Sequence, residues 1–184
     1  MNWIAFFSQT GSEIVDLSKA LGRKPNLIVT NNFEEKIKFN SDLRKLNVTI
    51  QSGRHDLLMT YFGYQRIFSP SNTLITLHGY LRILPEDICT KYRILNGHPA
   101  LITHYPELKG KDPQIKTWEG NYPLLGSVVH KVTPGVDEGE VISSVSYTNR
   151  CDSLEEMYGK LKQTSLESWM WVLSGEKDLG CVLE

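Results

Sequence analysis

The sequence predicts an α/β protein whose open, mostly parallel sheet carries helices on both faces. Residues Asn2–Phe7 form a short apolar run of the kind found in fully buried strands. Apolar residues then recur at helical spacing over residues 14–21, Gly22 is placed to end that helix, and Leu27–Thr30 forms a second apolar run. A helix between two buried strands is typical of a parallel crossover, so the N-terminal region is expected to begin such a sheet.

The rest of the sequence continues this alternation. The helix expected over residues 153–174 has the clearest pattern, with an apolar face made by Leu154, Met157, Leu161, Leu166, Met170 and Leu173. Further helices are expected over 33–46, over 55–68 and from Pro85 onward. Further strands are expected at Val48–Ile50, Thr73–Leu77, Tyr92–Leu95, Gly126–Val132 and Glu140–Tyr147, the last two with alternating character. In open sheets of this class ligands bind beyond the carboxyl ends of the strands.

Size and composition exclude several kinds of protein. A chain of 184 residues, 40% of them hydrophobic, suits one domain over residues 1–184. The net charge of −1 gives no indication of a nucleic-acid partner, and no apolar run approaches the roughly 20 residues of a membrane span. The N-terminus lacks the features of a signal peptide, so we expect a cytoplasmic protein. The three cysteines form no C-x-x-C pair, so neither a disulfide framework nor a zinc ribbon is predicted.

The turn after the first strand has two interpretations. Gly11 and Ser12 lie between a strand and a helix, where free backbone N–H groups can bind a phosphate. Thr10 and Glu13 have the spacing of a helix capping box, and Glu13 would repel a phosphate at close range. The pattern alone leaves both interpretations open.

A second candidate site follows the predicted strand Tyr92–Leu95. Pro99 disfavours helical geometry at His98, which suits a sharp exit from the strand with Asn96 and His98 near its end. An amide can donate to a developing oxyanion, and an imidazole can exchange protons near neutral pH. An Asn-Gly turn explains the same residues structurally.

The third candidate is Asp137, in the loop between the last two predicted strands. Its carboxylate can hold and charge-stabilise His98 across space, although an Asp turn ended by Gly139 explains it as well. The spacing of His98, His104 and His130 fits no compact ligand pattern, so no metal site is predicted.

Four stretches together resemble the folate-dependent formyltransferase family. They are, in chain order, "FFSQTGSEI", "LHGYLRILPEDI", "ILNGHPALITHYPELKG" and "GSVVHKVTPGVDEGEVI". The last two are similar to the family's N-x-H-P-[SA]-L-[LI] segment and its Val-His segment followed by D-x-G, which are specific motifs. The resemblance covers roughly residues 1–175 and implies a single domain with the Rossmann-like fold of glycinamide ribonucleotide transformylase.

This resemblance implies a reaction and its catalytic residues. A primary amine of a small molecule attacks the formyl carbon of 10-formyltetrahydrofolate, and Asn96 and His98 donate to the oxyanion that forms. Asp137 raises the pKa of His98, holds it protonated, and helps to move a proton from the amine to the leaving nitrogen. The chemistry needs no metal.

The resemblance also implies the binding residues. The pterin is expected along Leu81, Arg82, Ile83 and Leu84, mainly through backbone groups, with Val136 closing the other side. Gly11, Ser12 and Glu13 are expected to bind the amine substrate.

Some features depart from the purine-pathway members of the family. Those enzymes usually have Asn where this sequence has Glu13, and the segment after Pro106 reads differently. The acceptor amine is therefore open, with a nucleotide or sugar nucleotide among the candidates. The alternatives are a 10-formyltetrahydrofolate hydrolase, glycinamide ribonucleotide formyltransferase proper, and a catalytically silent folate- or nucleotide-binding module. The chain is expected to be too short to carry the C-terminal barrel of methionyl-tRNA formyltransferases. Aromatic residues near Trp169 and Trp171 are expected to be exposed, which leaves a homodimer open.

Overall fold

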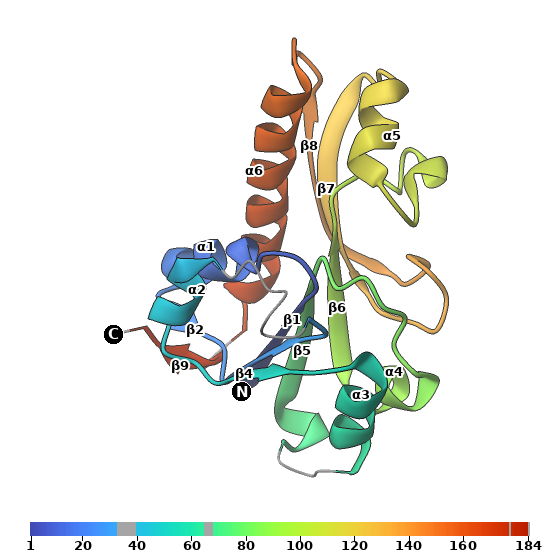
Figure 1. Cartoon of the computed structure of the whole chain (residues 1–184). Helices are drawn as coiled ribbons and strands as arrows, with labels where there is room; N and C mark the ends of the chain where they lie inside the picture. The colour runs from blue at the N-terminus through green and yellow to red at the C-terminus, as the bar shows by residue number, and fades with distance from the viewer. Residues whose placement is uncertain (33–39, 65–67, 177, 184) are drawn as a thin grey trace.

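One seven-stranded sheet forms the centre of the protein in a computed structural model, which describes residues 1–32, 40–64, 68–176 and 178–183 (Figure 1). Its spatial order is β4 (Ile50–Ser52), β3 (Leu27–Thr30), β1 (Asn2–Phe7), β5 (Thr73–His78), β6 (Arg93–His98), β7 (Leu124–Lys131) and β8 (Val141–Thr148). The first five strands of this order pair in parallel, and β7 and β8 pair antiparallel. The predicted open, mostly parallel sheet is confirmed.

Helices cover both faces of this sheet, as predicted. One face packs against α1 (Ser12–Leu21), α2 (Ser41–Lys45) and α6 (Leu154–Leu173), and the other against α3 (His55–Tyr64) and α4 (Glu86–Lys91). The helix α5 (Pro113–Glu119) contacts α6, and two short 3₁₀ turns are η2 (Pro70–Asn72) and η3 (Pro106–Leu108). The alternation along β1 explains this layering, because Trp3 and Phe7 enter one core cluster while Ile4 and Phe6 enter the other.

A two-stranded antiparallel sheet closes the chain on itself. It consists of β2 (Arg23–Lys24) and β9 (Cys181–Val182), and Figure 1 shows the C-terminal segment returning beside α1 and α2. The backbone N–H of Gly180 donates to the carbonyl of Met1, so both ends of the described chain meet here.

The predicted turn at Asn96 is wrong. The strand β6 continues through His98, because Asn96 pairs with Leu77 of β5 on one side and with His130 of β7 on the other. A strand between two partners has its backbone groups satisfied on both edges, so nothing ends it at Leu95.

The predicted capping box is also wrong. Helix α1 begins at Ser12 with Gly11 as its N-cap at φ 67°, and the Thr10 hydroxyl accepts from the backbone N–H of Ser12 at 3.3 Å rather than from that of Glu13. Glu13 turns away from the helix end towards His78. A buried imidazole is a stronger partner for this carboxylate than an exposed backbone N–H.

Other boundaries differ in smaller ways. Strand β4 begins at Ile50 rather than Val48, and β7 is buried over most of its length instead of alternating. Helix α3 ends at Tyr64, while residues 65–67, and 33–39 of the predicted charged helix, lie outside the described part of the chain. The helix start after Pro85 and the long C-terminal helix are confirmed.

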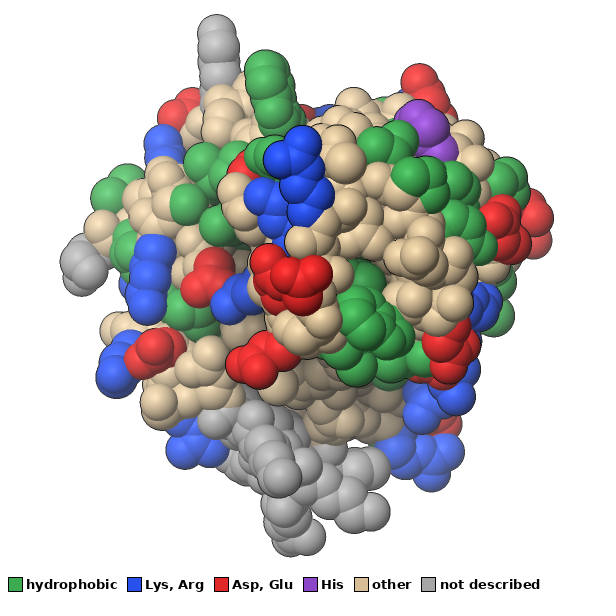
Figure 2. Space-filling model, turned by 90° about the horizontal axis from the view of Figure 1, so that it is seen from above, with side chains coloured by type: hydrophobic (Ala, Val, Ile, Leu, Met, Phe, Trp, Pro, Cys, Tyr) green, Lys and Arg blue, Asp and Glu red, His purple; other side chains and the backbone are tan. Residues whose placement is uncertain are grey.

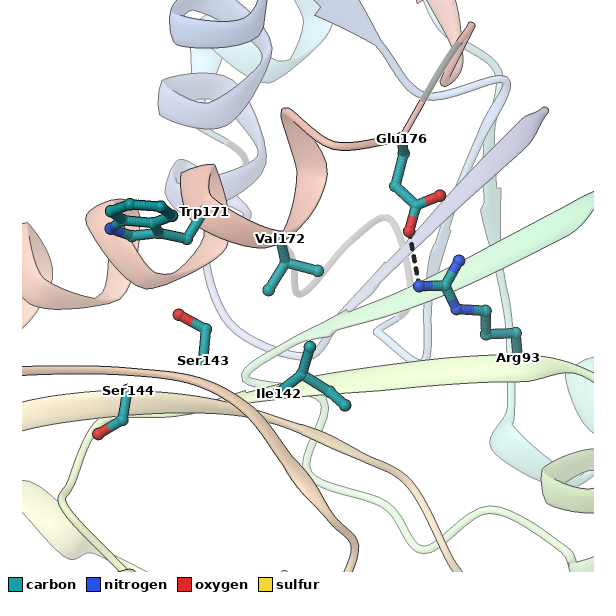
Figure 3. A pocket seen from close by; sticks show the side chains of 7 residues that line it. All are labelled: Arg93, Ile142, Ser143, Ser144, Trp171, Val172 and Glu176. Atoms are coloured by element: carbon teal, nitrogen blue, oxygen red, sulfur yellow. Dashed lines mark ion pairs between the residues drawn. The ribbon is translucent and has the colours of Figure 1, made fainter.

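The two tryptophans of α6 differ in exposure. Trp169 has no exposed surface and Trp171 is 79% exposed, so the expectation of exposed aromatics holds only for Trp171. Trp171 lines a hollow of about 450 Å³ at the amino end of β6, where Arg93 reaches Glu176 with 2.6 Å between Nη2 and Oε1 (Figure 3).

The outer surface is mixed in charge. Figure 2 shows acidic and basic side chains interspersed over the face seen from above, with hydrophobic side chains between them. None of the helices in the described residues is long and apolar enough to cross a lipid bilayer.

Candidate functional site

The end of β6 supplies the amide and the imidazole of the predicted site. Side chains alternate along a strand, so Asn96 and His98 lie on one face of the sheet and Gly97 on the other. A β-carbon on Gly97 would lie 2.5 Å from Nε1 of Trp169 in α6. Glycine is needed here because the indole packs directly on the strand.

Asp137 meets both side chains from the loop between β7 and β8. Its Oδ2 atom lies 3.2 Å from Nδ1 of His98 and accepts a hydrogen bond of 2.8 Å from the backbone N–H of Gly110. Its Oδ1 atom lies 3.5 Å from Nδ2 of Asn96. Asp137, which follows Asn96 by 41 positions in the sequence, therefore shares one largely buried cluster with Asn96 and His98.

Both ring nitrogens of His98 face acceptors. Nε2 donates to the carbonyl of Leu108 at 2.9 Å, and Nδ1 faces Asp137. Burial lowers the pKa of His98 below its ordinary value, and the Asp137 charge and the Leu108 carbonyl oppose this only in part. Asp137 therefore acts to raise the pKa of His98, as expected, but burial outweighs it, so the expectation that Asp137 holds His98 protonated is wrong.

For the carboxyl group of Asp137, the effects that favour the charged form outweigh burial. Burial acts to raise its pKa, but the His130 hydrogen bond, the charge of His98 and the Gly110 N–H together outweigh it. The pKa of Asp137 is held below its ordinary value, so the carboxylate is ionised at neutral pH although its side chain is only 9% exposed.

His130 is a fourth member that the sequence interpretation missed as a site residue. Its Nδ1 donates to the carbonyl of Lys131 at 2.8 Å, while Nε2 lies 3.1 Å from Nδ2 of Asn96 and 3.3 Å from Oδ1 of Asp137. It therefore fixes the orientation of the Asn96 amide. The Val-His pair in its motif was a signal, but only the antiparallel register shows that His130 lies opposite Asn96.

Most of the residues expected to bind the pterin have exposed side chains. Leu81, Ile83 and Val136 are 63%, 70% and 51% exposed, and Arg82 is exposed as well. The backbone N–H of Leu81 donates to Ser8 Oγ at 2.9 Å. Leu84 differs, because its side chain is buried in the core.

The residues expected to bind the substrate lie at a cavity on the opposite face of β6. It has a volume of about 400 Å³ and is lined by Gly11, Ser12 and Glu13, by Gly97 and Pro99, and by side chains of α6. Gly97 lies between Asn96 and His98 in the strand and faces the other way. The backbone of β6 therefore separates this cavity from the Asp137 cluster.

No metal centre is apparent among the described residues. They contain no group of three or more His, Cys, Asp or Glu side chains arranged to hold a metal ion. His104 belongs to no such group: its ring lies tilted against that of Tyr105, and its Nδ1 lies 3.1 Å from the Thr103 hydroxyl.

Comparison with known proteins gives a consistent family assignment. The family model described as "Formyl transferase" matches residues 64–173, more than half of the chain. A curated phosphoribosylglycinamide formyltransferase from Dictyostelium discoideum is 31% identical over 113 residues, which span 55% of this chain and 55% of that protein. The match thus covers about half the length of this relative.

Solved structures show the same fold over nearly the whole chain. The phosphoribosylglycinamide formyltransferase from Campylobacter jejuni superposes with a TM-score of 0.76 at 20% identity, covering 94% of this chain and 97% of that one. A formyltetrahydrofolate deformylase from Pseudomonas syringae gives a TM-score of 0.68 at 17% identity, covering 100% of this chain and 66% of that one.

Proposed function

Because the chain belongs to the formyl transferase family, we propose that it transfers a formyl group from 10-formyltetrahydrofolate to a primary amine on a small molecule. The observation that carries this proposal is the largely buried cluster of Asn96, His98 and Asp137, whose side chains converge from β6 and from the loop between β7 and β8. Amide and imidazole donors beside an ionised carboxylate are what acyl transfer to an amine requires.

In this proposal each residue of the cluster has one task. The Asn96 amide and the Nε2–H of His98 donate to the oxygen of the formyl group as the amine attacks its carbon. To do so, His98 exchanges its bond to the Leu108 carbonyl for a bond to that oxygen. Asp137 accepts the proton released by the amine and returns it to the folate nitrogen as the bond between that nitrogen and the formyl carbon breaks. His130 is a positioning residue for Asn96.

The exposed apolar side chains among the predicted pterin residues fit the second substrate. A pterin is flat and largely apolar on its faces, and Leu81, Ile83 and Val136 each offer exposed apolar surface, with Val136 next to Asp137 in the chain. Backbone groups of residues 81–84 would then recognise the polar edge of the ring.

Hydrolysis of the same formyl donor is the second candidate function. A water molecule in the place of the amine needs the same oxyanion donors and the same carboxylate, and a deformylase is among the proteins of similar fold. Glycinamide ribonucleotide formyl transfer proper requires a phosphorylated acceptor, which Glu13 does not favour at the cavity mouth.

A cytoplasmic location and a small-molecule acceptor belong to the same proposal. Cys89, Cys151 and Cys181 are all unpaired, as in proteins of reducing compartments. The net charge of −1 and the mixed charges on the face seen in Figure 2 do not favour a nucleic-acid partner.

Steady-state release of tetrahydrofolate tests the proposal. The chain is mixed with 10-formyltetrahydrofolate and a panel of primary amines, and we expect amine-dependent release. Release of formate without any amine would identify a hydrolase. Binding of the folate without turnover across the panel would identify a silent binding module, and no binding at millimolar folate would refute the assignment.

A further inference from the structure

The cavity beside Gly97 contains a carboxylate at a place where an anionic ligand is usually expected. A helix N-terminus attracts anions through its free N–H groups and its dipole. In α1 the first turn holds Glu13, and its side chain lines the cavity. The chain therefore supplies its own anion there.

Two polar side chains hold this carboxylate in place, and the indole N–H of a third lies nearby. Nδ1 of His78 donates to Oε2 at 2.7 Å, and the hydroxyl of Ser165 in α6 donates to Oε1. The indole N–H of Trp169, fully buried and without a hydrogen-bond partner in the described structure, lies close enough to add a favourable field. Burial acts to raise the pKa of Glu13, but these donors outweigh it and lower the pKa below its ordinary value.

The carboxylate is held but not covered. About a quarter of the Glu13 side-chain surface remains accessible, and it opens into the cavity. A carboxylate has room for about four hydrogen bonds, so a ligand donor can still be accepted.

Positive charge in the cavity is already neutralised. Among the described lining residues, Lys162 is the side chain that carries a permanent positive charge, and its Nζ lies 2.9 Å from Oδ2 of Asp16. A phosphate would therefore meet the ionised Glu13 without a free cation to offset it, and like charges at close range disfavour binding strongly.

The remaining lining is neutral and polar. The cavity presents hydroxyl and amide groups from several elements: Gln9, Thr10, Ser12, Gln114, Tyr158 and Ser165. Such groups both donate and accept, which matches the hydroxyl groups of a sugar. The volume of about 400 Å³ suits a molecule of that size.

We propose that this cavity is the acceptor subsite, and that it selects a hydroxylated amine of the amino-sugar class without a phosphate, which Glu13 excludes. The inference rests on the formyl transfer proposed above. The sugar hydroxyls donate to Glu13, and the amine reaches the Asn96–His98 cluster past Pro99, which lines the cavity directly after the end of β6. Glu13 is thus a specificity-determining residue and takes no part in bond formation.

Calorimetric titration with two related amines tests this subsite. Glucosamine and glucosamine 6-phosphate differ by one phosphate, and each is titrated into the whole chain at neutral pH. We expect the wild type to bind glucosamine at least about tenfold more tightly than its phosphate ester. Raising the salt concentration should narrow this ratio, because a repulsion between charges is screened.

Variants of Glu13 show whether the preference depends on the charge of its side chain or on its shape. Glu13→Gln should bring the ratio close to one or invert it, while Glu13→Asp, which keeps the charge, should preserve the preference. Glu155→Gln, an exposed substitution of the same type in α6, serves as the matched control and should leave the ratio unchanged. Melting temperatures check folding, and Glu13→Asn replaces Glu13→Gln if the latter does not fold.

Several outcomes would overturn the subsite. They are equal or tighter binding of the phosphate ester by the wild type, no binding of either sugar, and a ratio that Glu13→Gln leaves unchanged. Titration of 10-formyltetrahydrofolate in the same samples distinguishes the two proposals. Folate turnover with another amine but no sugar preference refutes the subsite alone, whereas a sugar preference without folate binding refutes the formyl transfer.

Discussion

Two buried carboxylate–histidine pairs lie at the ends of neighbouring strands, and they differ in how complete their hydrogen bonding is. His78 ends β5 and pairs with Glu13 at 2.7 Å, while His98 ends β6 and pairs with Asp137 at 3.2 Å. The register places His78 directly beside Gly97, so the pairs lie on opposite faces within one residue of each other.

The pair of His78 is satisfied at both ring nitrogens. Nε2 lies 2.8 Å from the hydroxyl of Thr76, which itself accepts from the indole N–H of Trp3. The hydroxyl can then donate to the ring while Nδ1 donates to Glu13. One acceptor and one donor are all that an imidazole with a single N–H needs.

In the pair of His98, by contrast, the hydrogen bonding of the ring is incomplete when the imidazole carries a single N–H. Both nitrogens face acceptors, the Leu108 carbonyl and the Asp137 carboxylate, so only a ring with two N–H groups satisfies both. Burial opposes that second proton. The difference shows which pair is fixed and which is poised to exchange a proton, so we assign binding to the first and chemistry to the second.

The largest expected effect separates the two histidines by kinetics. His98→Gln should lower kcat for formyl transfer by at least about 100-fold, because it removes an oxyanion donor. His78→Gln should mainly raise the KM for the acceptor, because it loosens Glu13. Tetrahydrofolate release measures both, with circular dichroism as the check on folding. Equal losses of kcat in the two variants would remove the distinction between the pairs.

The second prediction concerns Gly97, which lies between the two carboxylate–histidine pairs. Gly97→Ala places a β-carbon 2.5 Å from Nε1 of Trp169, so the indole or the strand must move. We expect a loss of about 1–3 kcal/mol in the free energy of unfolding, measured by urea denaturation.

Gly159→Ala is the matched control for that substitution. It lies within α6 with no atom inside 4 Å of the added carbon, so helix propensity alone should stabilise the protein by up to about 1 kcal/mol. A Gly97→Ala variant as stable as this control would mean that Trp169 does not pack as described.

The sequence was sufficient to predict the sheet and to single out three residues that the structure brings together, for identifiable reasons. Buried parallel strands are continuous apolar runs, so β1, β3 and β5 stand out, and the apolar face of α6 marks the long helix. Asn96, His98 and Asp137 stand in specific motifs, and the structure places them in contact.

The features that could not be predicted from the sequence depend on contacts between residues far apart in the chain. The contact of His130 with Asn96 follows from the β6–β7 register, and the capture of Glu13 by His78 and Ser165 joins residues up to 152 positions apart. Local patterns instead favoured a turn at Asn96 and a capping box at Glu13. The pKa of His98 was misjudged because a motif shows the neighbouring charge but not the burial.

The third prediction concerns how the free energy of unfolding depends on pH through His98. The pKa of His98 is lowered in the folded chain, so protonation favours unfolding, and its stability contribution is complete above the unfolded value near 6.5. As pH falls below about 6.5, that contribution is lost at up to about 1.4 kcal/mol per pH unit until the folded pKa is reached.

Urea denaturation across pH 5 to 8 should therefore show a steeper loss in the wild type than in His98→Gln. The difference between the two curves isolates His98 from other buried groups. Asp137 contributes in a separate window, because its lowered pKa keeps its contribution intact until the pH falls below the ordinary Asp value of about 4. Parallel curves for the two proteins would contradict the burial argument.

The smallest effect is expected at a third acidic–basic pair, which lies at the amino end of β6 and tests whether burial is what matters. Arg93 and Glu176 are 2.6 Å apart, as close as the two histidine pairs, yet the Arg93 side chain is 48% exposed (Figure 3). Solvent screens such a pair, so Glu176→Gln should change the free energy of unfolding by less than about 1 kcal/mol. The change should shrink further in high salt, and kcat should stay as in the wild type. A larger effect would mean that distance, rather than burial, ranks the three pairs, and the comparison between His78 and His98 would lose its physical basis.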